Sequence, residues 1–137
     1  MSKQIKWLKI AFLLGIITDA LALIPMLYPP MAKLMWGFDQ FNSNYFFAMG
    51  YGASLMTGWT LLLIWAYKKP VERKFLALLT VVVIIGLIIT EIYTIAIGTI
   101  NLKKMIPTWV LQIVLIGLFS YSYVIAKKKE VLEIKKH

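Results

Sequence analysis

The chain has 137 residues, 61% of them hydrophobic, and a mean hydropathy of +0.78. Soluble domains are about 45–50% apolar, so this composition indicates a membrane protein rather than a soluble domain. The net charge is +9, and the absence of cysteine excludes a disulfide framework, a thiol redox centre and a cysteine-based metal site. Because the one histidine is His137, we expect no histidine-built metal or haem site, and no cofactor.

Four apolar runs are each long enough to span a bilayer, which takes about 20 mostly apolar residues. They cover residues 7–28, 45–67, 75–98 and 107–126. Because they occupy most of the chain, we expect a single domain, residues 1–137. The predicted fold class is an all-α integral membrane protein, a bundle of four antiparallel transmembrane helices.

The first run can be interpreted in two ways. Lysines, an apolar stretch and then Ala20-Leu21-Ala22 are typical of a signal peptide with a small-residue cleavage site, whose removal would leave three spans. Asp19 and the continuation of the apolar run to Leu27 argue against cleavage. We therefore expect this segment to be retained as a helix.

Residues 30–38, between the first and second spans, are predicted to form a short interfacial helix. Pro30 suits a first helical position, and the apolar residues that follow have the spacing of one helix face. Those residues are Met31, Leu34, Met35 and Phe38. An ordered loop with apolar side chains fits this segment equally well. The run Asn42-Ser43-Asn44 then offers an N-cap for the second span.

Small residues recur every four positions in the second span, at Gly50, Ser54 and Gly58. This spacing puts them on one helix face and allows close approach of another helix in lipid. We favour packing within the chain as the explanation. The alternative is a homodimer that forms through these three residues.

Positive charge is concentrated on one side of the predicted bundle. Twelve of the 15 Lys and Arg residues lie at or before the start of the first span, between the second and third, or after the last. The other three are Lys33, Lys103 and Lys104. The positive-inside rule then predicts that both termini lie in the cytoplasm. Aromatic residues at the span ends, Trp109 among them, are interpreted as interfacial anchors.

Two acidic residues, Asp19 and Glu91, lie inside apolar spans in which the one Lys, Arg or His is Lys9, near the start of the first span. A charged side chain at the bilayer centre costs at least ~3 kcal/mol, so each is a functional-site candidate. Counting along the helices from Tyr28 and from Gly98 puts both roughly 10–14 Å below the outer edge, at 1.5 Å per residue. In hydrocarbon, such acids are either protonated or matched by a cation from outside the chain.

Other polar residues fall near the same depth, so we predict an intramembrane pocket in the outer half. The predicted ligand-binding residues are Asp19, Tyr51, Ser54, Glu91, Tyr93, Thr94 and Gln112. For Asp19 alone, a hydrogen bond to a hydroxyl on a neighbouring helix, worth ~0.6–2 kcal/mol, is a nearly equal explanation. Met56 and Trp59 are interpreted as packing residues.

These observations favour a membrane-embedded binding protein for a lipid-like or cationic amphiphilic small molecule. The alternatives are a proton-coupled small-molecule transporter that acts as a homodimer, and a structural or accessory membrane subunit. Catalysis on a lipid ranks below binding, because the sequence contains no nucleophile–base pair, metal cluster or phosphate loop. The expected partner is the lipid bilayer, and no nucleic acid is expected.

The segment from Ala48 to Trp59, together with Lys69-Pro70-Val71-Glu72-Arg73, resembles small four-span prokaryotic membrane proteins with no established activity. That resemblance implies a multi-pass protein of a prokaryotic cell membrane. In architecture only, four spans with two inward carboxylates are similar to the sterol isomerase and sigma-2 receptor group. There, acidic residues in an intramembrane pocket face a cationic ligand or a carbocation.

Overall fold

The computed structural model describes residues 2–134, which form five helices and no strand. The helices are α1 (Lys3–Leu27), α2 (Pro29–Trp36), α3 (Ser43–Lys68), α4 (Phe75–Ala96) and α5 (Leu102–Ile134). Within the described range, α1, α3, α4 and α5 are each long and apolar enough to cross a membrane. The prediction of an all-α, four-span membrane protein is therefore confirmed. The predicted cytoplasmic charges at Lys135 and Lys136 lie outside the described residues.

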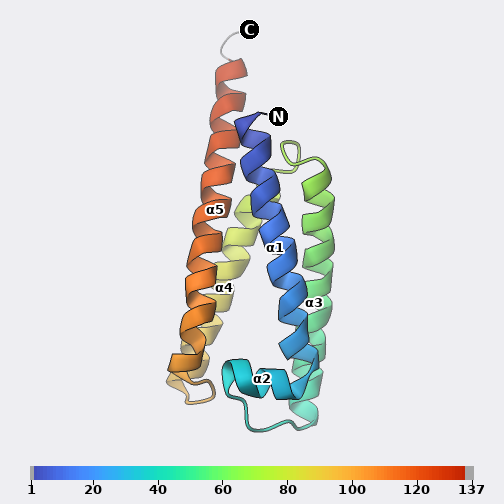
Figure 1. Cartoon of the computed structure of the whole chain (residues 1–137), viewed down its shortest axis with the longest axis vertical. Helices are drawn as coiled ribbons and strands as arrows, with labels where there is room; N and C mark the ends of the chain where they lie inside the picture. The colour runs from blue at the N-terminus through green and yellow to red at the C-terminus, as the bar shows by residue number, and fades with distance from the viewer. Residues whose placement is uncertain (1, 135–137) are drawn as a thin grey trace.

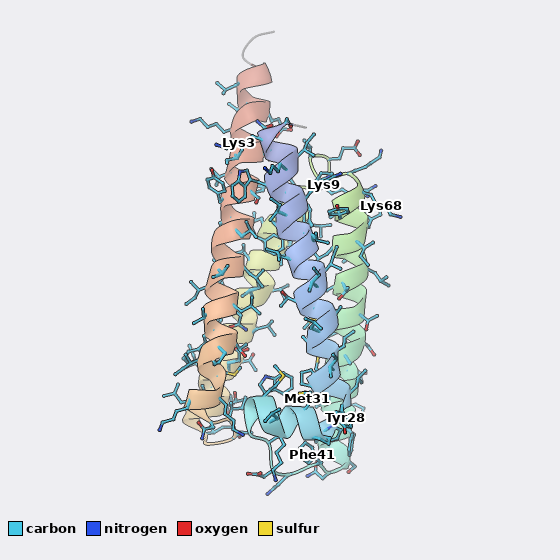
Figure 2. The ribbon with its side chains drawn as sticks, in the orientation of Figure 1. Lys3, Lys9, Tyr28, Met31, Phe41 and Lys68 are labelled. Atoms are coloured by element: carbon cyan, nitrogen blue, oxygen red, sulfur yellow. The ribbon has the colours of Figure 1, made fainter. Side chains whose placement is uncertain are left out.

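The four long helices run antiparallel to their chain neighbours, and short α2 lies across one end (Figure 1). α1 packs mainly against α3 and α5, and α4 packs mainly against α5. α2 contacts α1 and α5, and the two helix pairs spread apart toward it (Figure 1). We call this the α2 end, and we call the opposite end, where α1 begins and α5 finishes, the terminal end. Figure 2 shows Lys3, Lys9 and Lys68 near the terminal end and Tyr28, Met31 and Phe41 near the α2 end.

Local chemistry explains why α2 is separate from its neighbours. Tyr28 is extended because it precedes Pro29, so α1 ends at Leu27. The two prolines occupy the first positions of α2, where a missing N–H costs nothing. Gly37 ends the helix in the left-handed region at φ +81°, which favours glycine. The predicted short helix is confirmed, and the alternative of a loop is wrong.

The predicted apolar face of α2 is wrong, whereas the predicted N-cap of α3 is right. The packed face of α2 is centred on Ala32, which is fully buried, whereas Leu34 is 69% exposed, and Phe38 lies beyond the helix. The predicted face is therefore not the one that contacts the bundle, because a small residue lets α2 sit close to α1 and α5. The N-cap prediction is confirmed, since the Asn42 side chain accepts a hydrogen bond from the Tyr45 backbone N–H at 3.0 Å.

A hydrophobic core fills the terminal half of the bundle. We call it the core cluster, and its buried residues are Leu8, Ala11, Phe12, Leu63, Ala66, Ala77, Val81, Ile84, Leu115, Phe119 and Ala126. Gly15 allows α1 to approach its neighbours here, since a Cβ would lie 2.9 Å from Phe119 Cζ and 3.0 Å from Leu63 Cδ1. Many large apolar side chains point outward from all four long helices, as expected for lipid contact.

Polar contacts tie the ends of the bundle together. At the terminal end, the Ser122 hydroxyl donates to the Trp7 carbonyl at 3.1 Å, and Lys74 Nζ lies 3.0 Å from Glu130 Oε2. At the α2 end, Lys104 Nζ donates to the Lys33 carbonyl at 3.0 Å. This last contact joins the start of α5 to the last turn of α2.

Candidate functional site

Glu91 on α4 is held by two side chains of α5. The Trp109 indole Nε1 donates to Glu91 Oε2 at 2.9 Å, and Gln112 Nε2 donates to Glu91 Oε1 at 2.8 Å. Trp109 and Gln112 are three residues apart, so they lie on one face of α5 and can reach the same carboxylate. Each carboxylate oxygen thus accepts a bond, a pattern that suits the ionised form.

Trp109 is the contact that the sequence did not predict. Its position at a span end indicates an interfacial anchor, and the structure adds the bond to Glu91. The available signal was the three-residue spacing of Trp109 and Gln112, which puts two donors on one face of the helix that follows Glu91 in the chain.

Gln112 keeps one polar atom without a partner. The residue is only 7% exposed, and its Nε2 is used by Glu91. Its Oε1 is buried and has no hydrogen-bond partner among residues 2–134. A buried acceptor left unpaired costs about 1–3 kcal/mol, so a hydrogen-bond donor from outside the chain would stabilise this amide oxygen.

Asp19 on α1 also has an unpaired oxygen. It follows Gly15 by four residues, close to one helical turn, so it projects from the face of α1 that meets α3 and α5. Its Oδ2 is buried and finds no donor in the described part of the chain. The neighbouring Thr18 hydroxyl cannot help, because it donates to the Leu14 carbonyl at 2.8 Å.

The register of α1 against α3 puts Trp59 level with Asp19. Gly15 faces Leu63, and Gly52 of α3 faces Met26 of α1, so the two contacts agree on how the antiparallel helices align. Asp19, four residues after Gly15 on α1, is therefore level with Trp59, four residues before Leu63 on α3. Trp59 packs against the core cluster, and its buried Nε1 lacks an acceptor among the described residues.

The register of α1 against α5 puts Gln112 in the same layer. The contact of Gly15 with Phe119, and the bond from Ser122 to the Trp7 carbonyl, align Asp19 with residues 110–115 of α5. That range contains Gln112, which is bonded to Glu91. We call this set the polar layer, and its members are Asp19, Trp59, Glu91, Trp109 and Gln112. The layer lies on the α2 side of the core cluster.

The other predicted ligand residues do not join the polar layer through their side chains. The Thr94 hydroxyl donates to the carbonyls of Thr90 and Glu91, both at 2.9 Å. Tyr51 and Tyr93 are 63% and 64% exposed, and Ser54 is exposed and bonded to the Gly50 carbonyl at 3.0 Å. Of the predicted residues, the structure thus brings together Glu91 and Gln112 by contact, with Asp19 in the same layer.

The small-residue face of α3 is open. A Cβ added to Gly50 or Gly58 would meet nothing within 4 Å, so packing within the chain does not explain this spacing. That interpretation is wrong, because α3 contacts α1 through Gly52 and Ala53 on another face. A hollow of about 510 Å³ lies over the open face, and its lining residues are Phe46, Phe47, Gly50, Tyr51, Ser54 and Leu55. The homodimer through this face stays a prediction.

A second hollow, of about 740 Å³, lies at the α2 end between the α2–α3 and α4–α5 connections. Its lining includes Asp39, Asn42, Tyr45 and Asn101, but no member of the polar layer. Both asparagine side chains there cap helix N-termini, so each side-chain oxygen already accepts a hydrogen bond from a backbone N–H. The two connections enclose this hollow, and the buried Tyr45 hydroxyl in its lining has no hydrogen-bond partner among residues 2–134.

The polar layer does not resemble a metal centre. Among the described residues, no group of three His, Cys, Asp or Glu side chains lies close enough to hold a metal ion. Comparisons of the chain with protein-family models, with curated proteins and with solved structures find no match. The function must therefore be argued from the chemistry of the polar layer itself.

Proposed function

We propose that the protein is a membrane-embedded binding protein that holds a lipid-like or cationic amphiphilic small molecule at the polar layer. The observation that carries this proposal is the pair of unpaired buried oxygens, Asp19 Oδ2 and Gln112 Oε1, in the layer where Gln112 bonds the Glu91 carboxylate. All three are hydrogen-bond acceptors, and two belong to acids. A ligand that brings donors and positive charge would satisfy them together.

The chain itself supplies no cation at this depth. Lys9 lies near the start of the first span, ten residues before Asp19, the other Lys and Arg residues lie outside the apolar spans, and the histidine is residue 137. An unmatched carboxylate in the low dielectric of a bilayer is costly, and its electrostatic attraction for a cation from outside the chain is stronger there than in water. Under the positive-inside rule, the α2 end faces away from the cytoplasm, both termini are cytoplasmic, and the site lies in the outer half of a cell membrane.

Binding is better supported than transport. A carrier must expose its site to both sides in turn. The core cluster fills the terminal half with close-packed apolar side chains, and Thr60, Thr80 and Ser122 there bond backbone carbonyls. A ligand that enters from the α2 end or from the lipid therefore has no polar route onward.

The experiment compares Asp19→Asn and Glu91→Gln with the unchanged protein, purified in mild detergent. We expect octadecylamine to raise the thermal unfolding temperature of the unchanged protein and to do so much less in each variant. Glu72→Gln is the matched control, because it removes one carboxylate from an exposed connection where Glu72 lies 3.3 Å from Lys69. An equal shift in all four proteins would refute the proposal.

A further inference from the structure

We infer that the head group bound at the polar layer is a protonated primary amine with a hydroxyl on the neighbouring carbon, as in a long-chain amino alcohol. The inference rests on the proposed function and names the class of ligand. It follows from matching each unpaired atom of the polar layer with the kind of group that would satisfy it.

The acceptors require N–H bonds as well as charge. Asp19 Oδ2 and Gln112 Oε1 are buried on two different helices, α1 and α5, and both lack a donor among residues 2–134. A primary ammonium offers three N–H donors, which is enough for both oxygens. A quaternary ammonium has the same charge but no N–H, so it would leave the Gln112 oxygen unpaired in a residue that is 7% exposed.

Trp59 requires an acceptor. Its Nε1 is a donor only, is buried, and has no partner in the described part of the chain. The register of α1 against α3 puts it level with Asp19. A hydroxyl beside the amine would supply the acceptor that Trp59 lacks, and the amine would supply the donors that Asp19 and Gln112 lack, so an amino alcohol matches the chemistry of all three atoms.

Glu91 is already bonded, and this limits its part. Trp109 and Gln112 fill one acceptor position on each of its oxygens, at 2.9 and 2.8 Å. Its negative charge still attracts the amine. Its bond to Nε2 also fixes the Gln112 amide, so that Oε1 points away from Glu91 and is free to accept. Glu91 therefore acts partly as a positioning residue for Gln112.

The test uses three probes with the same octadecyl chain: sphinganine, octadecylamine and octadecyltrimethylammonium. Apparent affinities for the detergent-purified protein are measured by native mass spectrometry, with octadecanol as the uncharged control. We expect octadecylamine to bind about tenfold more tightly than octadecyltrimethylammonium, since hydrogen bonds to charged groups are the stronger kind. Sphinganine carries two hydroxyls, both on carbons next to the amine-bearing carbon, and we expect it to gain about a further threefold from the one that accepts from Trp59.

Two variants assign these preferences to residues. Trp59→Phe keeps an aromatic ring but removes the N–H, so it should abolish the advantage of sphinganine over octadecylamine. Gln112→Leu should reduce the preference for octadecylamine over octadecyltrimethylammonium. The comparison of probes on the unchanged protein needs no variant, so the inference can be tested even if a variant fails to fold.

The outcomes separate the inference from the proposed function. If octadecylamine and octadecyltrimethylammonium bind equally and both are lost in Asp19→Asn, the layer recognises charge alone and the inference is wrong, while the proposed function stands. If sphinganine has no advantage over octadecylamine, the inference is also wrong. If no charged probe binds better than octadecanol, the proposed function fails with it.

Discussion

Replacing Glu91 and Gln112 by leucine, singly and together, tests whether their hydrogen bond stabilises the contact between α4 and α5. The bond is 2.8 Å long, and Gln112 is almost fully buried. Hydrogen bonds to charged groups in water-soluble proteins contribute about 1.5–3 kcal/mol. Double-mutant cycles between membrane helices average only ~0.6 kcal/mol, with a maximum near ~1.7 kcal/mol, because the unfolded chain also finds partners in the membrane. We therefore expect a coupling energy of about 0.6–1.7 kcal/mol.

The cycle is preferred to a single substitution because Glu91→Leu also removes a costly carboxylate. That gain opposes the loss of two bonds, so the sign of the single effect does not report on the bond. The double-mutant cycle cancels such independent effects. The assay is the free energy of unfolding in mixed micelles, measured by titration with a denaturing detergent and followed by helical circular dichroism.

Two controls make the result specific. Glu91→Gln should lose less stability than Glu91→Leu, because Gln112 can turn its amide by half a rotation and accept from the new amide while Trp109 still donates. A cycle of Glu91→Leu with Ser54→Ala should show coupling near zero, because Ser54 is exposed and bonded within α3. A Glu91–Gln112 coupling no larger than this control value would refute the bonding described for α4 and α5.

Three further predictions follow from the packing. Asp19→Leu should raise the unfolding free energy of the ligand-free protein by about 1–3 kcal/mol, measured in the same micelle titration, because it removes an unpaired buried oxygen; a loss of stability would indicate that Asp19 is satisfied. Gly52→Leu should lower the unfolding temperature, because a Cβ there would lie 2.6 Å from Met26 Cε and the leucine must displace this flexible side-chain end. Gly50→Leu should leave the monomer intact and reduce any crosslinked dimer, and similar unfolding temperatures for the two variants would contradict the register. Lys74→Met and Glu130→Gln should each cost less than ~1 kcal/mol in thermal unfolding, because Glu130 is half exposed to solvent and such pairs contribute little; a larger loss would show that the ion pair anchors α5.

Much of the fold was predictable because the bilayer imposes strong rules on sequence. Hydropathy and length predicted the number of spans, Pro30 marked the start of α2 to within one residue, and Asn42 marked the start of α3. The expense of charge in lipid singled out Asp19 and Glu91. Each of these inferences needs only a residue and its neighbours along the chain, so no tertiary structure was required.

Only the tertiary structure decided which helix faces meet. In a soluble helix, polar residues mark the outward face, but these spans are apolar all round, so composition gives little indication of which face is buried. That is why Gly50 and Gly58 could be expected to pack within the chain and yet lie on an open face. For the same reason the sequence did not predict that Trp109 bonds Glu91 or that Trp59 lies level with Asp19. Both relations depend on how antiparallel helices align in three dimensions.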